Sequence, residues 1–357
     1  MLRIWMLSLV CFCGAAACSS KEEENSKKKD NEEPEVQSLR DAPFPAGVAI
    51  APNSLRNIAA YRELVIREAS TITAENAMKP GNISKGRGEY FWDDVDYLID
   101  FAQTNNMRLH GHCLVWYRQS VNSMPAWIQN FSGTKEEWKA IMREYILAVV
   151  GHCKGKVASW DVVNEAIADD GSFRGSTDVW CTNIGAPEYI DWAFRCAHEA
   201  DPDALLFYND YGHEYSAVKR TATNNLIRGM QERGVPVHGV GLQMHTNTNR
   251  SLQDLRTAIR TAAETGLKVH VSELDVSVNQ AGAADVTFTE ELQNAQFNSY
   301  MMVSSEMARL PQEQQHGITT WGVRDLETYG YPDWPLLFDK DFNRKKAYDG
   351  LYRGFSE

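Results

Sequence analysis

Cysteine is scarce in the main part of this 357-residue sequence, because three of its seven cysteines lie within the first 18 residues. The remaining four are Cys113, Cys153, Cys181 and Cys196, and their spacing matches no metal-binding pattern. Cys181 and Cys196 are the closest pair, so an exported chain could form one disulfide between them. The residues do not decide this point, and we otherwise expect the four cysteines to pack as small apolar side chains.

Positive charge is also limited. The chain has 36 Lys and Arg residues against 48 Asp and Glu residues, which gives a formal net charge of −12. Because binding to a nucleic-acid backbone needs clustered Lys and Arg, we expect no nucleic-acid partner. A neutral or weakly acidic substrate fits this charge better.

Motifs for cofactors and catalytic metals are missing. No Gly-rich phosphate loop follows a predicted strand, and the sequence has no HExxH pattern. The two histidines of "HGH" at 110–112 and His152 do not change this, since we expect His110 to pack outward against a helix. The sequence therefore predicts no cofactor and no metal ligands at the site, and it leaves open a structural ion bound in a loop.

The N-terminus begins with an apolar run that is too short for a stable membrane span. Arg3, the apolar "IWMLSLVCFC" and the small residues of "GAAAC" together predict an export signal in residues 1–17. Small residues followed by Cys18 resemble a bacterial lipobox, which implies that Cys18 becomes the lipidated first residue. An ordinary secretory signal cleaved near Ala17 is the alternative.

Residues 18–42 contain the charged stretch "SSKEEENSKKKDNEEPE", which has no aromatic residue. Such a segment cannot bury enough apolar surface to fold, so we expect a flexible tether. The acidic run directly after Cys18 resembles the signal that directs some bacterial lipoproteins to the outer cell surface. We therefore expect an exported outer-membrane lipoprotein, exposed at the cell surface, that meets the membrane only through its lipid anchor.

Residues 43–357 alternate between short apolar runs and amphipathic stretches. A short apolar run is typical of a parallel strand that is covered on both faces. The eight strand candidates are 47–50, 69–76, 108–116, 157–165, 204–210, 239–245, 268–276 and 317–323. One intervening helix begins with a capping box, in which Thr134 is followed three residues later by Glu137. This pattern predicts an α/β fold, a single (β/α)8 TIM barrel.

Several of the predicted strands end in polar residues, in "AEN", "VVNE", "YND", "QMH" and "SEL". A single such ending could cap a helix or satisfy loop backbone. Five in register favour a functional site, because barrel enzymes carry their chemistry where the strands end. Two of these endings supply Glu165, after the fourth strand, and Glu273, in the seventh.

Two carboxylates that face each other across a cleft suit the cleavage of a glycosidic bond. One donates a proton to the leaving oxygen and the other acts as nucleophile or base. A separation of about 5–5.5 Å gives retention of anomeric configuration and about 6.5–9.5 Å gives inversion, which sequence alone leaves open. A His that donates to one carboxylate keeps that one charged, so that the other carries the proton.

At these residues the chain resembles a known family. "WDVVNEA" and "VSELDV" are similar to the acid/base and nucleophile motifs of glycoside hydrolase family 10, the endo-β-1,4-xylanase family of clan A. The resemblance extends over the barrel, through "TAENAMKP", "GHCLVWYRQ", "YNDYG", "VGLQMH" and "WGVRD…PLLFD". It implies a retaining endo-β-1,4-xylanase that hydrolyses internal bonds of xylan by double displacement, with xylan or xylo-oligosaccharide as its partner.

The resemblance also implies roles for individual residues. Glu165 is the acid/base, Glu273 is the nucleophile, and Asn164 holds the 2-hydroxyl of the sugar being cleaved. His245 orients the nucleophile, with Gln243 beside it. The other implied sugar-binding residues are Glu75, Asn76, Lys79, His112, Trp116 and Gln119 on the glycone side, Trp321 and Tyr329 above the sugar, and Tyr211 toward the leaving group.

Three residues depart from the family pattern. Tyr117 replaces the usual His after "LVW", which suggests a changed hydrogen-bond network, and Gly212 replaces the Asn of "NDYN". Tyr329 stands where the family has a second Trp above the sugar. That Trp and the Gln matched by Gln119 favour xylose over glucose, so Tyr329 could loosen this preference unless Trp334 takes the place of the Trp.

Two alternatives follow from these departures. The chain could be a family-10 relative that acts on β-1,3-xylan, decorated xylan or β-glucosides. From a different class, it could be a non-catalytic glycan-binding surface lipoprotein, although binding alone does not require both glutamates together with Asn164 and His245. We expect a monomer in either case.

Overall fold

The computed structural model describes residues 38–120, 122–327 and 333–357. Within these residues eight parallel strands close into a barrel, because β11 pairs with both β1 and β10. The strands of the barrel are β1 (Ala46–Ile50), β2 (Thr71–Ala74), β5 (Arg108–Trp116), β6 (Ser159–Asn164), β7 (Leu205–Asp210), β8 (Gly239–Leu242), β10 (Lys268–Ser277) and β11 (Gln315–Thr320). Each falls on a predicted apolar run, so the predicted (β/α)8 barrel is confirmed.

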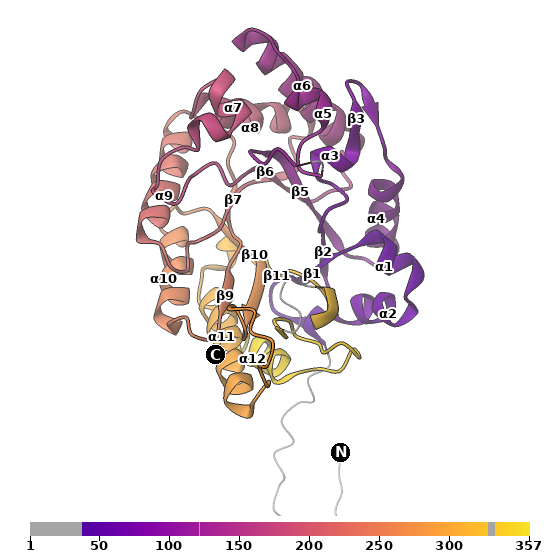
Figure 1. The fold of residues 1–357 in the computed structure, drawn as a ribbon, viewed down its shortest axis with the longest axis vertical. Helices are drawn as coiled ribbons and strands as arrows, with labels where there is room; N and C mark the ends of the chain where they lie inside the picture. Colours follow the sequence, from indigo (N-terminus) through magenta and orange to yellow (C-terminus); the bar gives the residue numbers. More distant parts are fainter. Residues whose placement is uncertain (1–37, 121, 328–332) are drawn as a thin grey trace, which may run out of the picture. The chain divides into compact units, whose positions relative to one another are not determined.

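Helices surround the strands, as Figure 1 shows. The longer ones are α2 (Ala59–Glu68), α4 (Asp93–Thr104), α6 (Lys135–His152), α8 (Glu188–Ala200), α9 (Ala217–Glu232), α10 (Leu252–Ala263), α11 (Glu290–Ala308) and α12 (Lys346–Gly354). The predicted capping box at the start of α6 is present: the Glu137 amide donates to Thr134 Oγ1, and the Thr134 amide donates to Glu137 Oε2 over 2.7 Å. None of the described helices is both long and apolar enough to cross a membrane.

Short elements fill the connections between strands and helices. They are α1 (Pro52–Asn57), α3 (Pro80–Ile83), α5 (Ala126–Gln129), α7 (Val179–Asn183), β9 (His245–Asn247), the hairpin of β3 (Ser84–Gly86) and β4 (Glu89–Tyr90), and four 3-10 turns at Leu39–Asp41, Gly175–Thr177, Gln312–Gln314 and Asp325–Glu327. β9 continues beyond β8 and pairs with β10.

The first described residues, which fall within the predicted tether, are ordered against the barrel. Leu39 is buried, and its amide donates to Glu68 Oε2 at the end of α2. Residues 38–42 therefore contribute to the packing of the folded body.

All four cysteines outside the first 18 residues carry free thiols, and Cys113, Cys153 and Cys196 are buried. The disulfide that the sequence left open between Cys181 and Cys196 is therefore not formed, and three of the four thiols pack as small core residues. Burial raises the pKa of Cys153 and Cys196 to about 12, which makes both thiols unreactive at neutral pH.

The barrel interior contains an unexpected group of histidines. His110 Nδ1 lies 2.7 Å from Ser159 Oγ, and its ring contacts the ring of His270 with centroids 4.8 Å apart. Residues two apart on a strand share a face, so His110 and His112 both point inward and both approach Asp161. The prediction that His110 packs outward is wrong for this reason.

Candidate active site

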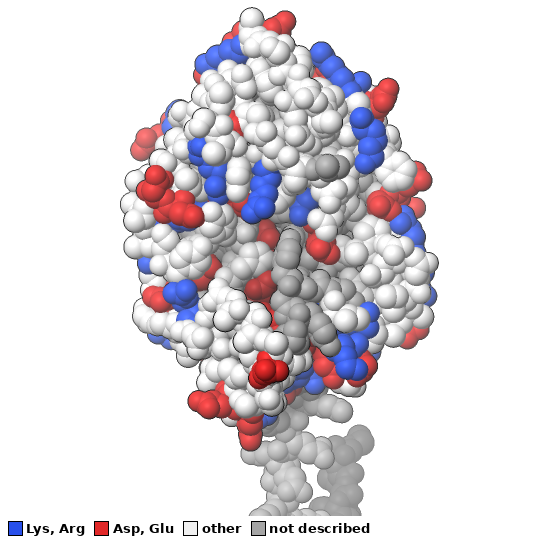
Figure 2. Space-filling model, in the orientation of Figure 1, with Lys and Arg blue, Asp and Glu red and all other residues white. Residues whose placement is uncertain are grey.

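The polar strand ends meet at the carboxyl end of the barrel around a cavity of about 650 Å³. Ten of the fourteen predicted site residues line this cavity. They are Lys79, His112, Trp116, Asn164, Glu165, Tyr211, Gln243, His245, Glu273 and Trp321. Figure 2 shows one face of the molecule, on which Lys and Arg are interspersed with Asp and Glu.

Glu273, in β10, is buried and held by two donors. Asn209 Nδ2 donates to Oε1 over 2.7 Å, and His245 Nε2 lies 3.2 Å from Oε2. Burial by itself raises the pKa of Glu273, but the hydrogen bond from His245 and the charge of the neighbouring histidines outweigh burial and place this pKa below its usual value. Glu273 is therefore ionised at neutral pH, as a nucleophile must be.

His245 is in turn held by a second carboxylate. Its Nδ1 lies 2.7 Å from Asp275 Oδ2, two residues along β10 from the nucleophile. Burial opposes the charged imidazolium, but the negative charge of Asp275 and the hydrogen bonds to Asp275 and Glu273 raise the pKa of His245 well above its usual value. His245 thus presents a fixed positive charge and an N–H to Glu273.

Glu165, directly after β6, has a different environment. Its backbone lies in the left-handed region, with φ 57°, and its amide donates to the Asn209 carbonyl over 2.9 Å. Gln243 Nε2 donates to Glu165 Oε1 over 2.9 Å. Glu165 Oε2 is buried and has no hydrogen-bond partner among the described residues. One oxygen is therefore fixed by the protein, and the other is available to a substrate.

An amide network links the two carboxylates. Ser272 Oγ donates to Asn209 Oδ1 over 2.6 Å, which fixes the orientation of that amide, and Asn209 Nδ2 then donates to Asn164 Oδ1 over 2.9 Å as well as to Glu273. Asn164 and Asn209 are direct neighbours in the pairing of β6 with β7. Gly241 lies opposite Asn209 on β8, where a Cβ would approach Asn209 Oδ1 to 2.2 Å. The network therefore requires glycine at that position.

Two tryptophans and a lysine form one wall of the cavity. Lys79 Nζ lies 5.1 Å from the Trp116 ring and 5.9 Å from the Trp321 ring. The His112 ring packs edge-on against Trp321, with centroids 5.3 Å apart. Aromatic faces beside charged and polar donors suit a sugar, which has flat C–H faces and hydroxyl edges.

Arg174, which the sequence analysis missed, supports the part of the cavity wall that Glu165 and Tyr211 form. Its Nε donates to the Glu165 carbonyl over 2.5 Å and its Nη2 donates to Tyr211 Oη over 3.1 Å. The guanidinium lies 3.8 Å from the ring centroid of Tyr117, so Tyr117 supports Arg174 by a cation–π contact. A changed hydrogen-bond network was expected at Tyr117, and the structure shows a cation–π contact with Arg174 at this residue.

A buried ion pair lies under this wall. Lys219 Nζ contacts Asp210 Oδ1 at 2.7 Å and lies 3.4 Å from the Tyr211 ring centroid, which fixes the position of that ring. Gly212 has φ +83°, and a Cβ there would come within 3.1 Å of Lys219 and Tyr215. The glycine that replaces Asn at this position adopts this left-handed conformation without strain.

Three more predicted residues, Glu75, Asn76 and Gln119, lie outside the cavity lining. Asn76 Nδ2 donates to Glu75 Oε1 over 2.9 Å, and Lys79 Nζ donates to Asn76 Oδ1 over 3.0 Å, so Glu75 and Asn76 adjoin the wall through Lys79. Gln119 is exposed on the loop after β5. Tyr329 lies outside the described residues.

Two acids at the site were not identified from the sequence. Asp275 supports His245, as described above. Glu214 lines the cavity from the segment after β7, and burial raises its pKa to about 7. Asp275 stands in the quoted "VSELDV" motif, so its spacing from Glu273 was the available signal.

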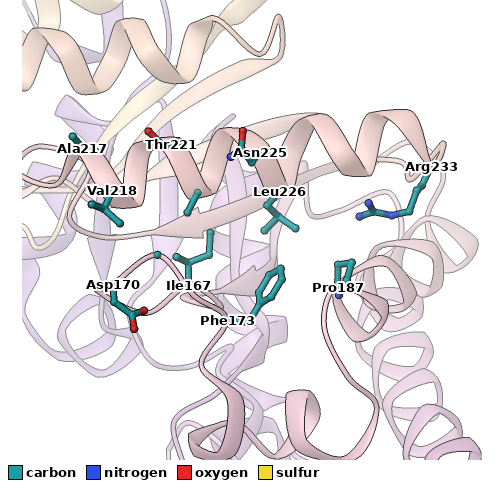
Figure 3. Close-up of a pocket in the computed structure, with 12 residues that line it drawn as sticks. Ile167, Asp170, Phe173, Pro187, Ala217, Val218, Thr221, Asn225, Leu226 and Arg233 are labelled. Atoms are coloured by element: carbon teal, nitrogen blue, oxygen red, sulfur yellow. The ribbon is translucent and has the colours of Figure 1, made fainter.

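A second cavity, of about 680 Å³, lies between α9 and the loops that follow β6. Figure 3 shows Ile167, Phe173, Val218 and Leu226 around it. Its lining is mainly apolar and holds no pair of facing carboxylates. It therefore lacks the groups that glycosidic cleavage requires.

Comparisons with known proteins agree with this geometry. The sequence profile of the family described as Glycosyl hydrolase family 10 matches residues 36–353. A β-1,4-xylanase of Dictyoglomus thermophilum is 37% identical over 331 residues, covering 89% of this chain and 90% of that protein. Native xylanase10C of Cellvibrio japonicus superposes with a TM-score of 0.85 at 33% identity, covering 90% of this chain and 73% of that one. A mutant of that enzyme has been solved with xylopentaose.

Some curated relatives are much longer. The chain is 33% identical to exoglucanase XynX of Acetivibrio thermocellus over 333 residues, which cover 89% of this chain but only 29% of that protein. The similarity therefore concerns one part of such a relative.

Proposed function

The chain belongs to glycosyl hydrolase family 10, and we propose that it is a retaining endo-β-1,4-xylanase that hydrolyses internal bonds of xylan by double displacement. The observation that carries this proposal is the pair of buried carboxylates joined by amides. Glu273 is held ionised by His245 and Asn209, whereas Glu165 keeps one buried oxygen without a partner among the described residues. A glycosidase of this type needs one charged and one protonated carboxyl group.

In the first step, Glu273 attacks the anomeric carbon while Glu165 Oε2 gives its proton to the glycosidic oxygen. The bond to the leaving sugar breaks, and a covalent glycosyl ester forms on Glu273. Asn164 lies between the two acids, where its amide can bind the sugar 2-hydroxyl as positive charge develops on the ring. Because that contact strengthens in the transition state, it lowers the barrier.

In the second step, water enters from the leaving-group side and gives a proton to Glu165, which is now ionised. The oxygen of that water attacks the anomeric carbon, the ester bond breaks and Glu273 leaves as a carboxylate. Arg174 lies on this side and lies 3.9 Å from Glu165 Oε2.

Two displacements at one carbon restore the original configuration, so the first product of xylan cleavage should be the β-anomer. We expect a fresh digest, followed by proton NMR before mutarotation, to show the β-anomeric signal first and the α-signal only later. Appearance of the α-anomer first would rule out double displacement at Glu273.

The substrate class is tested by following the products over time on plain xylan, arabinoxylan, β-1,3-xylan and mixed-linkage glucan. We expect short xylo-oligosaccharides of mixed length from the first minutes on plain xylan, as internal cleavage requires. The alternative is a β-glucosidic or decorated substrate, which is favoured by the similarity to an exoglucanase and by Tyr329 in place of Trp. Faster release from mixed-linkage glucan than from xylan would support that alternative.

A glycan-binding protein without catalysis is the remaining alternative. A binding site has no need for an ionised Glu273 supported by both His245 and Asp275. Retention of xylan without any release of reducing sugar would nevertheless favour it over the enzyme.

The pH profile provides a separate prediction. His245 lowers the pKa of Glu273, so the nucleophile stays ionised, and active, to lower pH than an ordinary buried Glu. In His245→Ala the opposing effect of burial remains, and the pKa of Glu273 rises. The acidic limb of kcat/KM, which reports the free enzyme, should move to higher pH. For His245→Gln, whose side chain can still donate a hydrogen bond, the acidic limb should lie between those of the unaltered enzyme and of His245→Ala. An acidic limb at the same pH in all three proteins would contradict this assignment.

For the N-terminus we propose export and lipid attachment at Cys18, which tethers the enzyme to the outer surface of the cell. The supporting features are the apolar run, the small residues before Cys18 and the charged stretch after it. In a bacterial host, the chain should take up labelled fatty acid and sediment with membranes, and Cys18→Ala should do neither. Equal labelling of the two proteins would reject the anchor.

A further inference from the structure

Three histidines meet in the barrel interior, beneath the active site. His110 comes from β5, His270 from β10 and His316 from β11, and all three are at most 3% exposed. One ligand atom from each lies within 4.8 Å of the other two. The mechanism described above uses none of them.

Each of these imidazoles has one nitrogen held by a hydroxyl group. Ser159 Oγ lies 2.7 Å from His110 Nδ1 and 3.2 Å from His316 Nε2, and Thr319 Oγ1 lies 2.9 Å from His270 Nε2. A hydrogen bond on one nitrogen is how proteins orient a histidine whose other nitrogen binds a metal.

The other nitrogens of two of these rings have no such partner. His110 Nε2 is buried with the Asp161 Oδ2 oxygen 3.1 Å away, and His270 Nδ1 is buried and makes no hydrogen bond in the part of the chain that the structure describes. Asp161 Oδ1, also buried, is in the same situation. Native proteins rarely leave several polar atoms unsatisfied in one place unless a water or an ion completes the site.

We propose that His110, His270 and His316 bind one divalent transition-metal ion, of the Zn²⁺ type, inside the barrel. Imidazole nitrogens suit Zn²⁺, Ni²⁺ and Cu²⁺ and do not suit Mg²⁺ or Ca²⁺. Asp161, whose Oδ2 lies 3.1 Å from His110 Nε2, lies beside this three-histidine site. Tetrahedral Zn²⁺ at about 2.0–2.1 Å from each nitrogen requires the ligand atoms to move somewhat closer together than they lie here.

The site has a structural role. It joins β5, β10 and β11, the last two of which pair where the barrel closes. It is also one step from the active site, because Asp161 Oδ2 lies 2.9 Å from His112 Nδ1, and His112 lines the catalytic cavity. Metal binding should therefore raise the stability of the barrel and fix the position of His112.

The test uses the whole chain without a histidine tag, because a tag would itself bind metal. Metal exchanges slowly at a buried site, so it is added or withheld during refolding. The protein is unfolded and refolded with Zn²⁺ or with EDTA, excess metal is removed, and bound metal is measured by elemental analysis. We expect one Zn²⁺ per chain and a Tm at least about 5 °C above that of the EDTA-treated protein. Less than a tenth of an ion per chain, with equal Tm values, would overturn the proposal.

Variants locate the ion. His270→Gln and His316→Gln should each lose the bound Zn²⁺, whereas His152→Gln, on the outside of α6, should keep it. Should the core variants fail to fold, Co²⁺ in the unaltered chain gives the answer. Visible bands of tetrahedral Co²⁺ without a thiolate charge-transfer band would support the histidine site. A thiolate band, or metal retained in both core variants, would place the ion elsewhere.

Discussion

Replacing Glu273 with Ala should abolish hydrolysis of xylan and of activated aryl xylobiosides alike, with kcat lower by about five orders of magnitude. Both substrates require a covalent bond to Glu273, and a better leaving group cannot replace a missing nucleophile. Initial rates on both substrates measure the effect. Circular dichroism should show that the variant remains folded.

Glu214 provides a matched control for this prediction. It is a buried carboxyl group lining the same cavity, but burial raises its pKa to about 7, so about half of the molecules carry it in the neutral form at that pH. Glu214→Gln imitates that neutral form and should lose less than about tenfold in kcat, because Glu214 has no reacting bond to form. If Glu273→Ala kept activity comparable to Glu214→Gln, Glu273 would not be the nucleophile.

The barrel and the two carboxylates could be predicted from the sequence because each depends on local pattern. A parallel strand covered on both faces appears as a short apolar run, and a site at the strand ends appears as a polar residue directly after that run. Glu165 follows this rule, and Glu273 interrupts the apolar run of the seventh strand near its end. The structure places both in the cavity, with His245 beside Glu273.

The side-chain contacts between separate strands and loops could not be predicted in the same way. Asn209 stood in the quoted "YND", but its role depends on its register with Asn164 and on Gly241 leaving space beside it. Arg174 lies in the loop after β6, and nothing in its neighbouring residues indicates that it returns to the Glu165 carbonyl. Such contacts arise only when separate segments are brought together.

The histidine cluster illustrates the same limit together with an error. The strand period of two places His110 on the same side of β5 as His112, so both side chains point into the barrel. Its partners His270 and His316 come from strands that are 160 and 206 residues further along the chain. Judged by spacing alone, the three histidines match no metal motif, although the barrel brings them together.

Replacing Glu165 with Ala should separate the two chemical steps. On xylan, whose leaving group must be protonated, kcat/KM should fall by roughly 10²–10⁴. On an aryl xylobioside with a very acidic phenol, formation of the covalent intermediate needs no proton, so its rate should change by less than about tenfold. Hydrolysis of that intermediate still needs a base, so a burst of phenol followed by slow turnover should appear.

Azide then distinguishes the roles of the two acids. In Glu165→Ala the small anion can occupy the space left by the side chain and attack the intermediate without help from a base, so turnover should recover and give the β-glycosyl azide. In Glu273→Ala no intermediate forms, and azide attacking from the side of the missing nucleophile should give the α-azide from the activated substrate only. Because the two products have opposite configurations, they report on which face of the sugar each carboxylate lies. An α-azide from Glu165→Ala would reverse the assignment of acid/base and nucleophile.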